Sequence, residues 1–320
     1  MSTTKVATRT RKPSEPALTT DSVVLTLDDL TALVPVGVAA KYVGRKIYGV
    51  QDFTVLRDAR TNHENVLIYG PTGPGKTMVA RAYAETDKIA FYPFNCSAGG
   101  TLSGLVGKMT MQPDGKFVWQ DGPLTALARR GGVFYLNEVN MLPSNIAASL
   151  FGLLDARRQL VLEDHDGEIV NVHPNFQIIA DYNPDYRGTR PLNEAFKNRF
   201  PVKIEWDYDT TVEKSLVSSA SLREMASKLR KMVGTEIQTP VSTNMLMEFE
   251  KFASRYSVKW AGENFISAFD GDERPAVRNV VKMHLVNIED DLNPKVAPQV
   301  DDVEDLTDID LDDIAFEIEV

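Results

Sequence analysis

Short apolar runs alternate with amphipathic segments through the first two thirds of the chain. Apolar runs predict strands at 65–69, 89–94, 133–136 and 176–180. Segments with helical spacing lie at 77–84, 124–130 and 146–158, and the stretch 28–60 is mostly helical in pattern. Strands that alternate with helices form parallel sheets covered on both faces, so this pattern predicts an α/β fold.

Two pairs of strand-like segments interrupt the alternation. The first pair, 108–111 and 116–120, surrounds Asp114-Gly115, and the second pair, 160–163 and 168–172, surrounds Asp166-Gly167. Asp-Gly between residues of strand character favours a tight turn. The sequence therefore predicts two β-hairpins inserted into the α/β domain.

The pattern becomes helical after Trp206. Helices are predicted at 213–232, 245–256, 260–269 and 276–287. We therefore expect an α/β domain over residues 28–206 and a small helical domain over 207–288. The flanking segments 1–27 and 289–320 are expected to be disordered tails, the first basic and the second acidic.

Composition and charge place the chain among globular proteins. Of the 320 residues, 43% are hydrophobic and 25% are charged, which is enough for a sizeable core. The net charge of −10 lies mainly in the tails, because residues 289–320 carry −12 and residues 1–12 carry +4. The body is near neutral, so nucleic acid is not an expected partner.

Cysteine content and hydropathy exclude several kinds of site and indicate the cellular compartment. The single cysteine, Cys96, excludes an intrachain disulfide and an all-cysteine metal cage. No apolar run approaches the roughly 20 residues of a membrane-spanning helix, so no membrane association is expected. We expect a cytoplasmic protein.

A glycine-rich turn follows the first predicted strand of the α/β domain. It reads Gly70-Pro71-Thr72-Gly73-Pro74-Gly75-Lys76-Thr77 and matches G-x-x-x-x-G-K-[ST] between a strand and a helix. The glycines allow backbone N–H groups to face phosphates, and the helix N-terminus adds partial positive charge. Lys76 would reach the β- and γ-phosphates, and the Thr77 hydroxyl would bind Mg²⁺. The motif predicts binding of ATP with Mg²⁺. The alternative is a tight glycine turn that contains a lysine and binds no nucleotide.

The apolar strand at 133–136 ends in Asn137-Glu138. P-loop ATPases normally carry Asp-Glu at this place, where the aspartate helps to hold the metal and the glutamate polarises the attacking water. Glu138 is therefore a candidate catalytic residue. Asn137 can accept a hydrogen bond from metal-bound water or from Thr77, but it brings no negative charge. We expect ATP hydrolysis that is slow or dependent on a partner.

Further motifs recur in a fixed order along the chain. They are Asn95-Cys96-Ser97, Leu105-Val106-Gly107, Gly122-Pro123-Leu124-Thr125, Gly132, Leu154-Asp155-Ala156-Arg157-Arg158 and His173-Pro174-Asn175-Phe176. The segments 180–188 and 192–200 extend the series. In these motifs the chain resembles the MoxR-class AAA+ ATPases over roughly residues 40–288. It is most similar to the CbbQ/NorQ branch, with features of the cobaltochelatase subunit CobS.

The resemblance implies a P-loop AAA+ fold, in which a parallel sheet sandwich with two hairpin inserts precedes a helical lid domain. By position, Asn183 resembles the sensor-1 residue beside the γ-phosphate. Arg199 resembles the arginine finger that acts on the ATP of a neighbouring subunit, which implies a homo-oligomeric ring, expected to be a hexamer. At the sensor-2 position Asn244 replaces the usual arginine, and Arg274 and Arg278 are weaker candidates to replace it.

The resemblance also implies a function. It is that of a ring-forming, Mg-ATP-dependent motor that remodels or activates a client protein, as a chaperone or in metal insertion. A separate protein with a von Willebrand factor A domain is an expected partner. Two alternatives stay open: a catalytically weakened ATP-binding scaffold, and a nucleic-acid-stimulated motor. The acidic tail is either a solvated segment or a short motif that docks on a partner.

Overall fold

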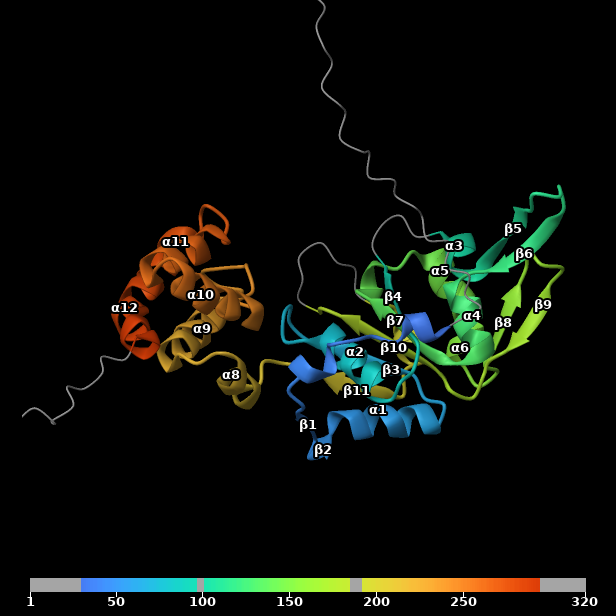
Figure 1. Ribbon diagram of the computed structural model, residues 1–320, viewed down its shortest axis with the longest axis horizontal. Helices are drawn as coiled ribbons and strands as arrows, with labels where there is room; N and C mark the ends of the chain where they lie inside the picture. Colours follow the sequence, from blue (N-terminus) through green and yellow to red (C-terminus); the bar gives the residue numbers. More distant parts are fainter. Residues whose placement is uncertain (1–29, 97–100, 185–191, 294–320) are drawn as a thin grey trace, which may run out of the picture.

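The computed structural model describes residues 30–96, 101–184 and 192–293. Residues 30–209 contain the sheet and the helices that cover it, and we call them the α/β region. Residues 210–292 are helical and lie to one side of it, and we call them the helical region (Figure 1). The expected tail 1–27 and residues 294–320 of the expected tail 289–320 lie outside the described residues.

Five parallel strands form the central sheet, in the order β11-β3-β10-β7-β4. Their bounds are β3 (Val66–Tyr69), β4 (Phe91–Asn95), β7 (Gly132–Asn137), β10 (Phe176–Tyr182) and β11 (Val202–Glu205). All five end at the same edge because they are parallel. The glycine-rich turn after β3 therefore lies beside the residue that follows β10, although the two are over a hundred positions apart.

Helices cover both faces of this sheet, as an apolar parallel sheet requires (Figure 1). They are α1 (Asp52–Thr61), α2 (Lys76–Thr86), α3 (Leu102–Val106), α4 (Pro123–Arg130), α5 (Ser144–Ser149), α6 (Phe151–Leu154) and α7 (Glu194–Lys197). Alternate residues of a strand point to opposite faces. Thus Tyr135 packs in one core with Val79 of α2, and Leu136 packs in another core with Leu124 of α4. The predicted α/β fold with a parallel sheet is confirmed.

Two predicted helices are shorter than expected. Within 28–60, the described part contains only two 3-10 turns, a small hairpin of β1 (Lys46–Ile47) and β2 (Val50–Gln51), and α1. Tyr48 and Gly49 have φ angles of 48° and 89°, and they make the turn of that hairpin. The predicted helix 146–158 ends at Leu154, because Asp155 has an extended backbone with φ −99° and ψ −178°. Arg158, with a φ of 47°, then leads the chain into the next strand. The strand β11 was not predicted.

Both predicted hairpins are present. One consists of β5 (Gly107–Met111) and β6 (Phe117–Asp121), and the other of β8 (Gln159–Leu162) and β9 (Glu168–Asn171). They lie side by side at the end of the α/β region that is farthest from the helical region (Figure 1). Arg129 of α4 joins them, since its guanidinium pairs with Asp121 of β6 (3.0 Å) and with Glu168 of β9 (2.7 Å).

The helical region has its own apolar core, which includes Leu222, Phe249 and Val281. Its helices are α8 (Thr210–Leu216), α9 (Ala220–Met232), α10 (Thr243–Arg255), α11 (Val258–Ser267) and α12 (Arg274–Leu292). The predicted helix 213–232 is divided because the Ser219 hydroxyl accepts the Leu222 N–H and caps a new helix. None of the described helices is long and apolar enough to cross a membrane.

The last helix corrects the expected boundary at 288. It continues to Leu292, so the first acidic residues of the expected tail are helical. Asp291 holds this end in place, because its carboxylate accepts hydrogen bonds from the Ser219 hydroxyl and the Ser221 N–H, both at 2.8 Å.

Candidate functional site: a phosphate-binding loop at the edge of the sheet

The turn between β3 and α2 requires glycine at particular positions. Gly70, Gly73 and Gly75 have φ angles of 152°, 93° and 95°. A Cβ at Gly70 would lie 2.2 Å from the carbonyl oxygen of Trp206, and a Cβ at Gly73 would lie 2.2 Å from the Cβ of Ser242. Backbone conformation and close neighbours therefore both exclude a side chain at Gly70 and Gly73.

The N-terminus of α2 is open to an anion. Gly75 caps the helix without any side-chain hydrogen bond. Within the described part of the chain, no acceptor pairs with the backbone N–H groups of residues 75–78. Such N–H groups carry the positive end of the helix dipole, so together with the glycine turn they can bind phosphate oxygens.

Lys76 lies inside this turn and is only 6% exposed. Its Nζ donates hydrogen bonds to the carbonyl oxygens of Gly70 (2.9 Å) and Pro71 (2.6 Å), and to Oδ1 of Asn183 (2.5 Å). Burial lowers the pKa of Lys76, while the charges of Asp181 and Glu138 act in the opposite direction. The structure thus brings the predicted lysine and the predicted sensor residue into direct contact.

Glu138 follows β7 at the same edge of the sheet. Its backbone is left-handed, with a φ of 56°, and its N–H donates to Oδ1 of Asp181 (2.7 Å). Asp181 lies near the end of β10 and is 4% exposed. The hydroxyl groups of Tyr135 and Thr77 lie 3.3 Å apart. Glu138, Lys76, Thr77 and Asn183 therefore gather around the loop.

Asn137 lies at this edge too, but its side chain points toward the neighbouring strand β4. Its Nδ2 donates to Oδ1 of Asn95 at 2.9 Å. The amide is therefore engaged with β4 and adds no charge beside the loop.

The groups at this edge fit a magnesium nucleotide. Backbone N–H groups and the Lys76 ammonium suit phosphate oxygens. Mg²⁺ is usually held by one or two protein oxygens together with substrate phosphates, and the Thr77 hydroxyl and nearby carboxylates are oxygen ligands. The described residues contain no cluster of three or more His, Cys, Asp and Glu side chains that could hold a metal alone. This donor set suits a cation that arrives with its nucleotide.

Two cavities border the loop. The larger, about 800 Å³, is lined by Gly70 and Pro71 of the loop, by Pro184, and by Lys214 and Arg230 of the helical region. This volume is in the range of small-molecule pockets. The smaller, about 130 Å³, lies between the other side of the loop and α10. Its walls include Tyr42, Pro74, Met78, Val212, Asn244 and Met247.

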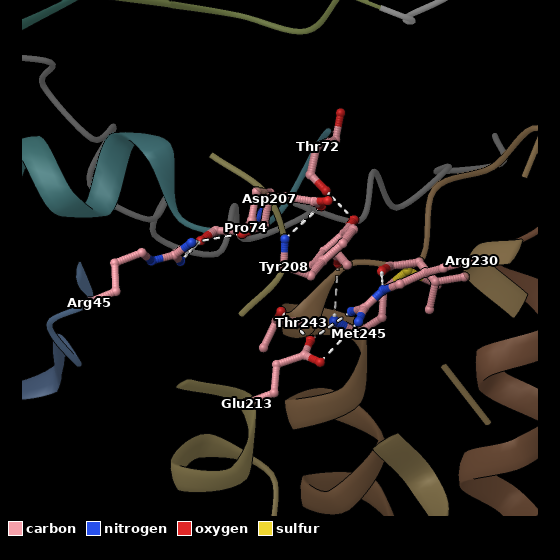
Figure 2. A network of polar contacts seen from close by, with 11 residues as sticks. Arg45, Thr72, Pro74, Asp207, Tyr208, Glu213, Arg230, Thr243 and Met245 are labelled. Carbon is pink, nitrogen blue, oxygen red and sulfur yellow. Dashed lines mark hydrogen bonds and ion pairs between the residues drawn. The ribbon is translucent and has the colours of Figure 1, made fainter. Parts of the chain in front are cut away.

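A polar network joins the loop to the helical region (Figure 2). The Tyr208 hydroxyl donates to the carbonyl oxygen of Thr72 at 2.6 Å. The Arg230 guanidinium lies 3.5 Å from the centre of the Tyr208 ring and forms two hydrogen bonds, of 2.7 and 2.9 Å, with Glu213. Glu213 also accepts the Thr243 hydroxyl at 2.7 Å. A change in the loop can thus reach α8, α9 and α10 through contiguous side chains.

Comparison with known proteins identifies the family. Residues 65–200 match the family described as AAA domain (dynein-related subfamily). An uncharacterized protein of Staphylococcus epidermidis is 36% identical over 183 residues, which are 55% of this chain and 69% of the relative. An uncharacterized protein of Staphylococcus aureus is 34% identical over 196 residues, 59% of this chain and 74% of the relative. The chain belongs to the AAA+ ATPases.

One similar solved structure is that of NtrX from Brucella abortus. It is 17% identical, and the similarity covers 78% of this AAA+ chain and 63% of NtrX, with a TM-score of 0.45.

Other predicted residues of this AAA+ protein lie away from the loop. The guanidinium of Arg199 lies 3.9 Å from the centre of the Phe151 ring and donates to the carbonyl oxygen of Ala195. Arg274 donates to main-chain oxygens at the end of α11, and Arg278 pairs with Glu263. The structure places neither Arg274 nor Arg278 in contact with the loop. Motif residues 97 and 185–188 lie outside the described residues.

The sequence interpretation missed two parts of the site. Asp181 had no assigned role, yet it is the one charged residue in the strand Phe176–Tyr182 and lies two positions before Asn183. That spacing puts both side chains on one face of the strand and could have indicated Asp181. The Tyr208–Arg230–Glu213 network carries no comparable motif, because its members come from separate elements.

Proposed function

We propose that this AAA+ protein hydrolyses ATP with Mg²⁺ and uses the reaction to move the helical region against the α/β region. One observation carries the proposal: Lys76 at the start of α2 lies close to Glu138 and Asn183, which follow β7 and β10, beside a turn whose N–H groups have no acceptor among the described residues. This is the arrangement that phosphoryl transfer to water needs, namely positioning and charge stabilisation.

Each residue has a distinct role in the proposed reaction. The N–H groups of residues 75–78 and the Lys76 ammonium bind the β- and γ-phosphates. Thr77 holds Mg²⁺, which supplies charge neutralisation on the phosphate oxygens when it is bound. Glu138 orients a water molecule and accepts its proton. Asn183, already fixed by Lys76, hydrogen-bonds the γ-phosphate or that water.

The contacts of the loop couple nucleotide binding to the position of the helical region. Thr72 is bonded to Tyr208, and Gly73 lies against Ser242 at the start of α10. A phosphate that reshapes the turn therefore acts directly on the helical region.

We infer a homo-oligomeric ring, a hexamer, in which Arg199 acts on the nucleotide of the neighbouring subunit. Among the described residues, the Arg199 guanidinium forms its hydrogen bond with Ala195 and its ring contact with Phe151, and neither belongs to the loop 70–77, which supports an action in trans.

The output that fits best is remodelling of a client protein, in the manner of the MoxR-class CbbQ/NorQ and CobS proteins, with a von Willebrand factor A domain protein as partner. Its support is the exposed apolar surface of the first hairpin, where Met111 and Phe117 are each 65% exposed. Exposed apolar side chains that gather on a projecting element are typical of a protein-binding surface.

A second candidate function is an ATP-binding scaffold without turnover. The observation that favours it is Asn137, whose amide is uncharged and hydrogen-bonded to Asn95. The two candidates differ in phosphate release and agree in nucleotide binding.

The test is phosphate release from Mg-ATP by the full chain over a range of protein concentrations, with and without DNA or RNA. Lys76→Ala should abolish nucleotide binding, and Glu138→Gln should retain binding and lose turnover. Lys251→Ala and Glu236→Gln, at exposed positions, serve as matched controls. Binding without phosphate release in the wild type supports the scaffold, and stimulation by nucleic acid supports a nucleic-acid motor.

A further inference from the structure

The strand that carries Glu138 lacks the carboxylate expected beside a magnesium nucleotide, but the adjacent strand has one. Ala180 of β10 pairs with Leu136 of β7, so Asp181 and Asn137 are the next residues on two neighbouring parallel strands. Asp181 and Asn137 therefore lie at the same level along the strand direction, on adjacent strands.

Asp181 points to the same face of the sheet as α2. Ile179 of β10 packs in one core with Val79 of α2, and residues two apart on a strand share a face. The same reasoning places Asn183 on this face, and Asn183 contacts Lys76. Asp181 thus lies beneath the N-terminal turn of α2, where Lys76 and Thr77 begin the helix.

Asp181 is a buried carboxylate close to the predicted magnesium ligand Thr77. One oxygen, Oδ1, accepts the Glu138 N–H at 2.7 Å. The pKa of Asp181 is raised, chiefly by burial and also by the Glu138 charge, and the Glu138 N–H, the Lys76 charge and a hydrogen bond with Tyr135 offset this only in part. A divalent cation nearby would favour the ionised carboxylate. The Tyr135 hydroxyl lies 3.3 Å from the Thr77 hydroxyl, so it bridges toward the predicted metal ligand. Asp181 is thus a buried carboxylate joined through Tyr135 to the residue that is predicted to hold Mg²⁺.

We propose that Asp181 supplies from β10 the negative charge toward Mg²⁺ that Asn137 cannot supply from β7. In this role Asp181 acts on Mg²⁺ held by Thr77 and the nucleotide phosphates, and it also fixes Glu138 through the backbone. The proposal rests on the proposed function, since it concerns the metal of the same nucleotide. A purely structural Asp181, which only accepts the Glu138 N–H, is the competing explanation.

The experiment measures how Mg²⁺ affects the binding of a fluorescent ADP analogue to the full chain, in EDTA and over a Mg²⁺ titration. Asp181→Asn removes the charge and keeps a carbonyl oxygen for the Glu138 N–H, so it separates the two explanations. We expect this variant to bind the analogue normally in EDTA and to need about tenfold more Mg²⁺, or more, than the wild type. Asn137→Asp added to Asp181→Asn should restore the Mg²⁺ requirement to near the wild-type value.

The outcomes are distinguishable. Equal Mg²⁺ requirements in the wild type and Asp181→Asn overturn the role of Asp181 and leave the proposed function standing. If the double variant needs as much Mg²⁺ as Asp181→Asn alone, an aspartate at position 137 cannot replace the charge of Asp181, and the proposal is contradicted. A wild type that binds no ADP analogue in either condition overturns the proposed function and this inference with it.

Thermal unfolding without nucleotide or Mg²⁺ checks that each variant is folded. If Asp181→Asn does not fold, Asp181→Ser replaces it, because serine also removes the charge and keeps an acceptor oxygen. The same increase in the Mg²⁺ requirement is expected for this variant.

Discussion

The Tyr208 hydroxyl donates a hydrogen bond to the main-chain oxygen of Thr72, and Tyr208 lies two residues before α8, which begins at Thr210. A single side chain thus connects the phosphate-binding loop with the helical region. Because the Tyr208 ring also lies under the Arg230 guanidinium, it makes two separable contributions, a hydrogen bond and a cation–π contact.

Substitution of Tyr208 separates these contributions. Tyr208→Phe removes only the hydroxyl and should lower the free energy of unfolding by about 1 kcal/mol, the net value of a typical hydrogen bond. Tyr208→Ala also removes the ring and should cost about 1–2 kcal/mol more. Urea denaturation measures both values. Equal losses in the two variants would mean that the ring does not stabilise Arg230.

The Glu213–Arg230 pair should make stability depend on pH. Burial alone raises the pKa of Glu213, but the hydrogen bonds from Arg230 and Thr243 and the Arg230 charge outweigh it, so the pKa is lowered on folding. A lowered pKa means that the ionised pair stabilises the fold above the unfolded pKa of about 4.3. This stabilisation is lost as the pH falls through the folded pKa.

Glu213→Gln tests this dependence. At pH 7 it should lower the free energy of unfolding by about 2 kcal/mol, since a buried hydrogen bond to a charged group is lost. The difference from the wild type should shrink as the pH falls below about 4. Denaturation curves at several pH values measure it, with exposed Glu236→Gln as the control. A difference that is constant with pH would show that Glu213 is not ionised in the folded protein.

Gly73→Ala should break the contact between the loop and α10. Its Cβ would lie 2.2 Å from the Cβ of Ser242, at a φ of 93°, so the strain adds to a steric clash. We expect loss of the rise in melting temperature that Mg-ADP gives to the wild type. The control is Gly115→Ala in the first hairpin, where φ is 81° but nothing lies within 4 Å of the added Cβ. That variant should lose only about 1–2 kcal/mol of stability and keep the response to nucleotide.

Mixing two inactive variants tests the action of Arg199 in trans. Arg199→Ala should reduce ATP turnover by about 10³-fold or more, and Lys76→Ala should abolish it. In a mixed ring, an intact loop from the Arg199→Ala subunit meets an intact Arg199 from the Lys76→Ala subunit. Activity should therefore return on mixing. A mixture that stays inactive, although light scattering shows mixed rings, would contradict the role of Arg199.

The sequence predicted those elements whose conformation depends on neighbouring residues in the chain. The glycine turn and the two Asp-Gly hairpins depend on positive φ angles, which few residue types adopt, so their motifs are specific. The strands β7 and β10 were predictable because both faces of each are buried. These elements place Lys76, Glu138 and Asn183 at one edge without further information.

The remaining features depend on distant partners. The strand β11 alternates apolar and charged residues over only Val202–Glu205, and it is a strand because β3 lies beside it. The division of the helix at Ser219 is stabilised by Asp291, which is over 70 positions later. The spacing of Asp181 and Asn183 could have marked Asp181 as a site residue, but its place beside Asn137 follows only from the strand order, in which β10 lies between β3 and β7.

The Arg129 side chain has a mechanical consequence for the protein. One guanidinium holds Asp121 of one hairpin and Glu168 of the other, and Trp119 stacks on His165 with ring centres 4.8 Å apart. The hairpins can separate only if the Trp119–His165 stacking and at least one of the two ion pairs of Arg129 are broken. We therefore expect a force on one hairpin to act on the other hairpin as well, and through Arg129 on α4.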